Sequence, residues 1–87
     1  MIEEKIKNLI EDTITKNNYK LCKVEYVKEN NIMFLRVYID KKGVMSIDDC
    51  VTVSNLINPI LDEADPIEES YMLDVCSKEK GSEEDGQ

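Results

Sequence analysis

Two adjacent strand-like segments constrain the fold of this chain more than any other feature. In residues 32–40 the side chains alternate between two faces, with Met33, Leu35, Val37 and Ile39 on one side and Phe34, Arg36 and Tyr38 on the other. Residues 21–28 are also rich in strand formers, and Cys22, Val24 and Tyr26 share one face. Glu29-Asn30-Asn31 separates the two segments, and asparagine tolerates positive φ. The pattern predicts an antiparallel hairpin with one apolar face.

Two apolar stripes at helical spacing lie on either side of this hairpin in the sequence. The first contains Ile2, Ile6, Leu9, Ile10 and Ile14, and Asn17 and Asn18 supply its stop. The second contains Cys50, Val53, Ile57, Ile60, Leu61 and Ala64. Ser46 and Asp49 have the spacing of a capping box at its start. Pro59 interrupts this stripe, and we expect Asn58 to cap a separate last turn, in preference to a kinked continuous helix.

A third strand follows over residues 71–77, with Tyr71, Leu73 and Val75 on one face and Met72, Asp74 and Cys76 on the other. The element order predicts an α+β fold, a two-layer α-β-β-α-β domain with both helices on one face of a three-stranded sheet. The pattern leaves open which strand lies beside the third. We expect the domain to span residues 1–77 and residues 78–87 to form a disordered acidic tail.

The charge balance limits the kind of partner. The net charge of −8 repels phosphate backbones, so direct nucleic-acid binding is not expected, whereas a basic protein is attracted. No apolar run approaches the length of a membrane span. Cys22, Cys50 and Cys76 are far apart in the sequence and form no Cys-x-x-Cys pair, which favours free, mostly buried thiols. We therefore expect a cytoplasmic monomer.

Catalysis is not expected, because the chain has no histidine and no glycine-rich phosphate loop, and no cofactor is called for. Asp48 and Asp49, with Asp40 nearby, could form a metal site for a small metal-dependent enzyme. The alternative is that Asp48 and Asp49 are first-turn carboxylates that the helix dipole favours.

Binding surfaces are the remaining candidates. The outer sheet face would present Lys23, Glu25, Val27, Phe34, Arg36, Tyr38, Met72 and Asp74. Its aromatic and apolar content suggests a contact surface, although cross-strand packing, with Arg36 paired to Glu25 or Asp74, would also account for it. A second candidate is an acid-rich rim of Glu25, Asp40, Asp48, Asp49, Asp62, Glu63 and Asp65, which could equally be a solvated surface. The partner-binding candidates are Glu25, Phe34, Arg36, Tyr38, Asp48 and Asp49.

Residues 21–29, 33–43, 46–54 and 63–77, in this order and spacing, closely resemble the N-terminal domain of the bacterial ribosome maturation factor RimP family. The resemblance implies a two-layer α+β domain and a role in assembly of the small (30S) ribosomal subunit, by transient binding to a ribosomal protein or to the pre-ribosomal particle. Members of this family continue with a Ser-Pro-Gly-containing linker and an Sm-like domain. Here Ser77 is followed by a short polar segment, so the alternative is a truncated or frameshifted fragment without independent activity.

Overall fold

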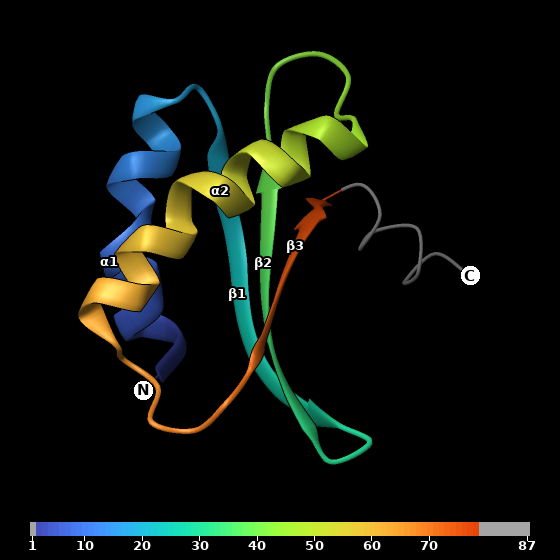
Figure 1. The fold of residues 1–87 in the computed structure, drawn as a ribbon. Coiled ribbons are helices and arrows are strands. Elements are labelled where there is room, and N and C mark those ends of the chain that lie inside the picture. Colours follow the sequence, from blue (N-terminus) through green and yellow to red (C-terminus); the bar gives the residue numbers. More distant parts are fainter. Residues whose placement is uncertain (1, 79–87) are drawn as a thin grey trace.

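The computed structural model describes residues 2–78, and its elements follow the predicted order. Helix α1 spans Ile2–Lys16, β1 Lys20–Glu29, β2 Ile32–Asp40, α2 Ile47–Ala64 and β3 Met72–Ser77 (Figure 1). No helix in this part of the chain is long and apolar enough to cross a membrane. Apart from Lys78, the predicted tail lies outside the described residues.

Strands β1 and β2 form the predicted antiparallel hairpin, with Glu29 opposite Ile32. The two residues between them, Asn30 and Asn31, have φ values of 52° and 66°. Positive φ at both positions is the requirement of a type I′ turn, whose twist matches that of the flanking strands. A third asparagine, Asn18, has φ of 68° just after α1, which confirms the predicted helix stop.

A β-bulge corrects the predicted face of Cys22. The register shifts between Leu21 and Lys23, so that Leu21 pairs with Ile39 whereas Lys23 pairs with Tyr38. Cys22 is the extra residue of the bulge, and Leu21 takes the buried position on the core face. Val24 and Tyr26 pack against the core as expected. Only Cys76 of the three cysteines is buried, while Cys22 and Cys50 are half-buried, so the expectation of mostly buried thiols is wrong.

The sheet is mixed, with β2 in the centre. Strand β3 pairs with β2 in parallel, and Phe34 lies opposite Met72 and Val37 opposite Val75. A parallel neighbour requires a crossover, which α2 supplies by running across the strands (Figure 1). The structure thereby identifies the neighbour of β3, which the sequence pattern left open.

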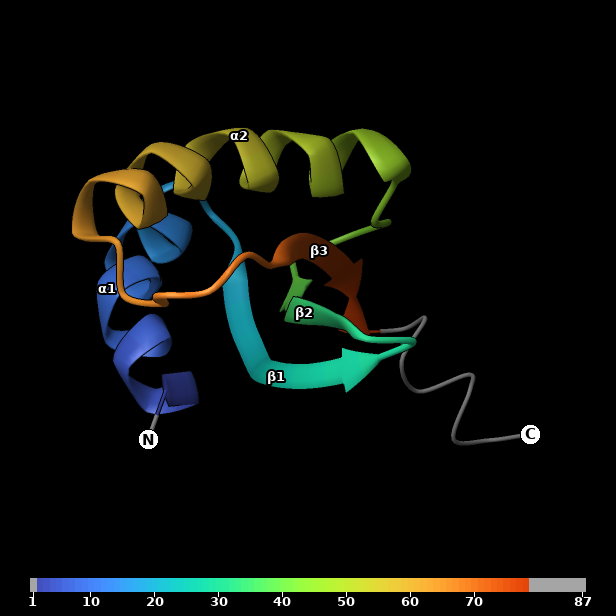
Figure 2. The same cartoon turned by 60° about the horizontal axis from the view of Figure 1, so that its bottom comes forward.

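Both helices cover one face of the sheet, as predicted (Figure 2). The core between the layers combines one apolar stripe from each helix with the inner side chains of β2. Its fully buried members are Ile6, Ile10 and Ile14 from α1, Val53, Ile57 and Leu61 from α2, and Leu35, Val37 and Ile39 from β2. The alternation predicted for residues 32–40 therefore has the correct register.

The expected break before Pro59 is wrong, because α2 runs continuously through it. Pro59 lacks the amide that would bond to the carbonyl of Asn55, but both residues are exposed, so water can reach that carbonyl. Ile57 and Leu61, on either side of the proline, are buried against the sheet. Their burial outweighs the loss of one hydrogen bond. The helix ends at Asp65, a left-handed C-cap whose amide donates to the Leu61 carbonyl at 2.8 Å.

Asp49 connects three segments of the fold. The predicted capping box is present, and the Asp49 carboxylate accepts from the backbone amide and the hydroxyl of Ser46 at 2.9 and 3.1 Å. It also accepts from the Tyr19 hydroxyl at 2.7 Å and from the Lys41 ammonium at 3.0 Å. The residue is only 9% exposed. These donors, Tyr19 first, hold the pKa of Asp49 well below its usual range.

Leu35→Ala should lower the free energy of unfolding by roughly 2–5 kcal/mol, because the truncation leaves a cavity between the sheet and both helices. Urea unfolding measures the change. The matched control is Ile32→Ala in the same strand, where the side chain is 48% exposed and the expected cost is below about 1 kcal/mol. Equal costs for the two variants would contradict the register of β2.

Pro59→Ala should raise the free energy of unfolding by about 1–3 kcal/mol, because alanine restores the amide donor and is the best helix former. Thermal and urea unfolding report the change. Asn58→Ala is the control, since it replaces an exposed helix residue without restoring a donor. A destabilised Pro59→Ala variant would show that the proline stabilises the fold by another route.

Asp49→Asn should flatten the acid dependence of stability. The pKa of Asp49 is lowered in the folded protein, so its contribution is fully present above the unfolded value of about 4 and is lost as pH falls toward the folded value. The difference in unfolding free energy between the wild type and Asp49→Asn should be largest near neutral pH and shrink on acidification. Asp48→Asn, at the exposed neighbouring position, is the control.

Candidate interaction surfaces

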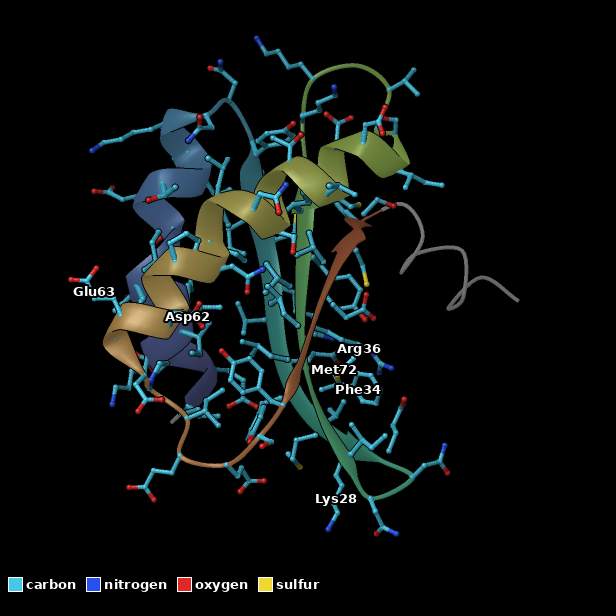
Figure 3. All side chains as sticks on the ribbon, in the orientation of Figure 1. Lys28, Phe34, Arg36, Asp62, Glu63 and Met72 are labelled. Atoms are coloured by element: carbon cyan, nitrogen blue, oxygen red, sulfur yellow. The ribbon has the colours of Figure 1, made fainter. Side chains whose placement is uncertain are left out.

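Three rows of side chains cross the outer face of the sheet, each with one residue from β1, β2 and β3. The strand register sets the rows as Val27–Phe34–Met72, Glu25–Arg36–Asp74 and Lys23–Tyr38–Cys76. All eight residues predicted for this face are among them. The first row is apolar, the second is charged, and the third is mixed. Phe34, Arg36 and Met72 lie close together where β2 and β3 run side by side (Figure 3).

Arg36 is the centre of the charged row. Its guanidinium binds Glu29 in a bidentate pair, with Nη2–Oε1 and Nη1–Oε2 distances of 2.7 and 3.1 Å. Its Nε donates to Asp74 at 3.4 Å, and the guanidinium carbon lies 5.1 Å from the centroid of the Phe34 ring. Glu29 is the main reason why the pKa of Arg36 is raised. The predicted pairing with Asp74 is present, but Glu29 takes the place proposed for Glu25 as its closest partner.

Glu25 has partners of its own in the mixed row. It accepts from the Tyr38 hydroxyl at 3.1 Å and from the Lys23 ammonium, also at 3.1 Å. The Lys23 hydrogen bond is the largest cause of its lowered pKa. Burial, followed by the bond to Glu25, raises the pKa of Tyr38 to about 12. Most charges on this face are therefore satisfied across the strands, as the packing alternative supposed.

The apolar row is the part of this face that packing leaves uncovered. Met72 is 56% exposed, and Ile32, one step further toward the hairpin turn, is 48% exposed. Val27 and Phe34 are half-buried between them. The outer face therefore combines a satisfied polar network with an exposed apolar strip at the hairpin end.

The predicted acidic rim is not one surface. Asp48 and Asp49 begin α2, and Asp40 ends β2, whereas Asp62, Glu63 and Asp65 lie at the opposite end of α2. These ends are separated by about 27 Å, the length of an 18-residue helix. The Asp49 carboxylate is buried among hydrogen-bond donors, so Asp49 does not remain a candidate for contact with a partner. Asp48 is exposed. Within residues 2–78, no three acidic or cysteine side chains are placed to hold a metal ion.

The strongest charge lies at the C-terminal end of α2. Asp62, Glu63, Asp65, Glu68 and Glu69, called here the acidic end, are all exposed. The last turn of α2 contains no basic residue, so the negative pole of the helix dipole adds to their charge. Figure 3 shows Asp62 and Glu63 at this end, well away from the Phe34–Arg36 region.

A cleft of about 360 Å³ opens between the acidic end and the start of β3. Asp62, Asp65 and Glu69 line it together with Ile67 and Tyr71. Burial, followed by the charges of Asp62 and Asp65, raises the pKa of Tyr71. The exposed lining of the cleft is mostly polar, and it places carboxylates beside the ring of Tyr71. This combination suits the charged group and the aliphatic stem of an arginine or lysine side chain.

The sequence contains a signal for this site that the rim hypothesis missed. Between Lys42 and Lys78 the chain has no lysine or arginine, but it has eight carboxylates, whereas residues 1–42 have nine basic and seven acidic residues. The negative charge is therefore concentrated in α2, in β3 and in the connection between them. The five acidic-end residues come together because the α2–β3 connection folds back beside the end of the helix.

A comparison with known protein families identifies the family of this chain. Residues 9–78 match the model of the RimP N-terminal domain. This range covers the second half of α1 and all of the elements from β1 to β3. The chain thus belongs to the RimP family of ribosome maturation factors, of which it contains the N-terminal domain.

Proposed function

We propose that this chain assists assembly of the small ribosomal subunit by transiently binding a basic ribosomal protein through the acidic end of α2. Membership of the RimP family supplies the process, ribosome maturation. The observation that supports the choice of partner is the segment between Lys42 and Lys78, which contains eight carboxylates and no lysine or arginine. Binding alone is sufficient for this role, without a catalytic step or a cofactor.

Electrostatics favours a protein partner over bare RNA. Five exposed carboxylates and the negative end of a helix dipole repel phosphates and attract lysine and arginine. Such charge increases the rate of encounter more than it increases the lifetime of a complex. An assembly factor that occupies an immature cytoplasmic particle and then leaves requires this combination of fast association and modest affinity.

The cleft supplies specificity beyond charge. An arginine from the partner can place its guanidinium between Asp62 and Asp65 while its stem packs on Tyr71. On the outer sheet face the charges of Glu25 and Arg36 are already paired, so Phe34 and its apolar neighbours are the groups that a second contact would cover. Tyr38 lies beside them with its hydroxyl bound to Glu25.

Reversing charge at the acidic end should weaken binding to immature small subunits. We expect Asp62→Lys combined with Glu63→Lys to lower affinity at least about tenfold at low salt, mostly through the association rate. Binding by the wild type should also fall steeply between low and moderate ionic strength. Cations are favoured at a helix C-terminus, so the double variant should be no less stable than the wild type.

The matched control is Glu11→Lys combined with Asp12→Lys. This pair is also exposed and adjacent on a helix, and it changes the net charge equally, but it lies on α1. Surface plasmon resonance with immobilised immature subunits, and with naked ribosomal RNA, gives both rates. Equal losses in the two variants would show that only net charge matters. Binding to RNA alone, or no binding by the wild type, would contradict the proposal.

A further inference from the structure

One buried hydroxyl in this structure has no hydrogen-bond partner. It belongs to Tyr26 in β1, and within residues 2–78 its oxygen is the one buried polar side-chain atom in that state. Nearly all buried polar groups in proteins are paired, so an unpaired hydroxyl requires a specific explanation. Such a group lowers the stability of the folded chain, and it gains a hydrogen bond if a neighbouring group moves or a ligand binds.

The Tyr26 side chain lies on the inner face of the sheet, where it packs against the core. Tyr26 is opposite Leu35, which is in turn opposite Leu73 near the start of β3. The connection from α2 to β3 passes β1 on this inner side before β3 begins (Figure 2). Burial, followed by the charge of Glu69, raises the pKa of Tyr26. The hydroxyl therefore lies near the Glu69 carboxylate, although the pair falls short of hydrogen-bond geometry in this structure.

Glu69 belongs to the wall of the cleft at the acidic end. Tyr71, the other ionisable neighbour of the Tyr26 hydroxyl, also lines this cleft, and Leu73 lines it from β3. Glu69 is exposed, whereas the Tyr26 oxygen is buried. The hydroxyl is therefore an unused donor behind the wall of the cleft, and a small side-chain rotation of Glu69 can bring the two groups into hydrogen-bond distance.

The basic residues on the neighbouring elements do not occupy these carboxylates. Lys5 and Lys7 lie on α1, whose start is near the end of α2, and Lys28 lies on β1 (Figure 1). All three lysines are exposed, and no ion pair among residues 2–78 joins them to the acidic end. The carboxylates that line the cleft therefore remain available to a cation from a partner.

We propose that Tyr26 is a positioning residue of this cleft, and that its hydroxyl donates to Glu69 when an arginine of a basic partner is bound. The arginine displaces water from the cleft, and a hydrogen bond to a carboxylate is stronger in the drier site. Glu69 then joins Asp62 and Asp65 as a third carboxylate around the guanidinium, which has five N–H donors. The inference rests on the proposed function, because it adds a residue from β1 to the site at the end of α2.

Tyr26→Phe tests the inference, because it removes the hydroxyl and keeps the ring. The probe is a blocked peptide of glycine and serine with two arginines, titrated into the ¹⁵N-labelled full chain at low salt. The wild type should bind it with amide shifts in residues 62–71, and Tyr26→Phe should weaken binding by about five- to tenfold. The free energy of unfolding should not fall in this variant, since the lost hydroxyl is unpaired in the free chain.

The matched control is Tyr38→Phe, which loses a hydroxyl that is bound to Glu25 on the outer face. This variant should change the affinity for the peptide less than about twofold. Equal binding by Tyr26→Phe and the wild type would overturn the inference. A Tyr26→Phe variant that is less stable than the wild type would also overturn it, because the hydroxyl would then be bonded in the free chain.

A double-mutant cycle shows whether the hydroxyl acts through Glu69. Glu69→Ala alone should weaken peptide binding at least as much as Tyr26→Phe. Adding Tyr26→Phe to Glu69→Ala should then lower the affinity less than about twofold further, because the acceptor is already absent. Fully additive losses would contradict a role of Tyr26 in positioning Glu69.

A second peptide separates the arginine site from general contact. Citrulline in place of arginine keeps the shape of the side chain but removes its charge, so this peptide should not bind, and equal binding would overturn the inference. No binding of the arginine peptide, or shifts confined to the outer sheet face, would do the same. If the arginine peptide binds with the expected dependence on Tyr26 while the wild-type chain does not bind immature subunits, the proposed function fails and the inference stands.

Discussion

The position of β2 between two partner strands, with its inner side chains buried under the helices, is the constraint on which the rest of this structure depends. The inner side chains of β2, Leu35, Val37 and Ile39, are fully buried under both helices, and its outer side chains form the middle of all three surface rows. Because β2 pairs with β1 and with β3, its register sets the face of every residue in the sheet. A slip of one residue would bury Arg36 and expose Leu35.

The carboxylates at the two ends of α2 have different roles. At its start, Asp49 accepts four hydrogen bonds and joins the loops before β1 and before α2, so acidity there stabilises the fold. At its end, the carboxylates face water and the negative pole of the helix, so acidity there is available to a partner. The same residue type has opposite roles because one group is buried among donors and the other is exposed.

The outer sheet face and the acidic end also differ in the groups that they expose. On the outer sheet face Arg36, Glu29 and Asp74 neutralise one another, which leaves shape and the apolar strip as the features that a partner could recognise. At the acidic end the five carboxylates are exposed to water. The described part of the chain therefore carries two separate surfaces of different chemistry, one with an apolar strip and one acidic.

The local pattern of the sequence was sufficient to determine the element order, the hairpin with its asparagine turn and the inward face of β2, because period and turn chemistry act over a few residues. It also contained the outer-face residues and the family resemblance. Only the tertiary structure decided that Pro59 stays within α2, that Leu21 replaces Cys22 in the core, and that β3 lies parallel to β2. Each of these depends on burial against distant segments. The acidic end was already visible in the sequence as a run of carboxylates without cations between Lys42 and Lys78. The partners of Asp49, in contrast, come together only in the folded chain, because Tyr19 and Lys41 belong to other segments, and no local pattern encodes that contact.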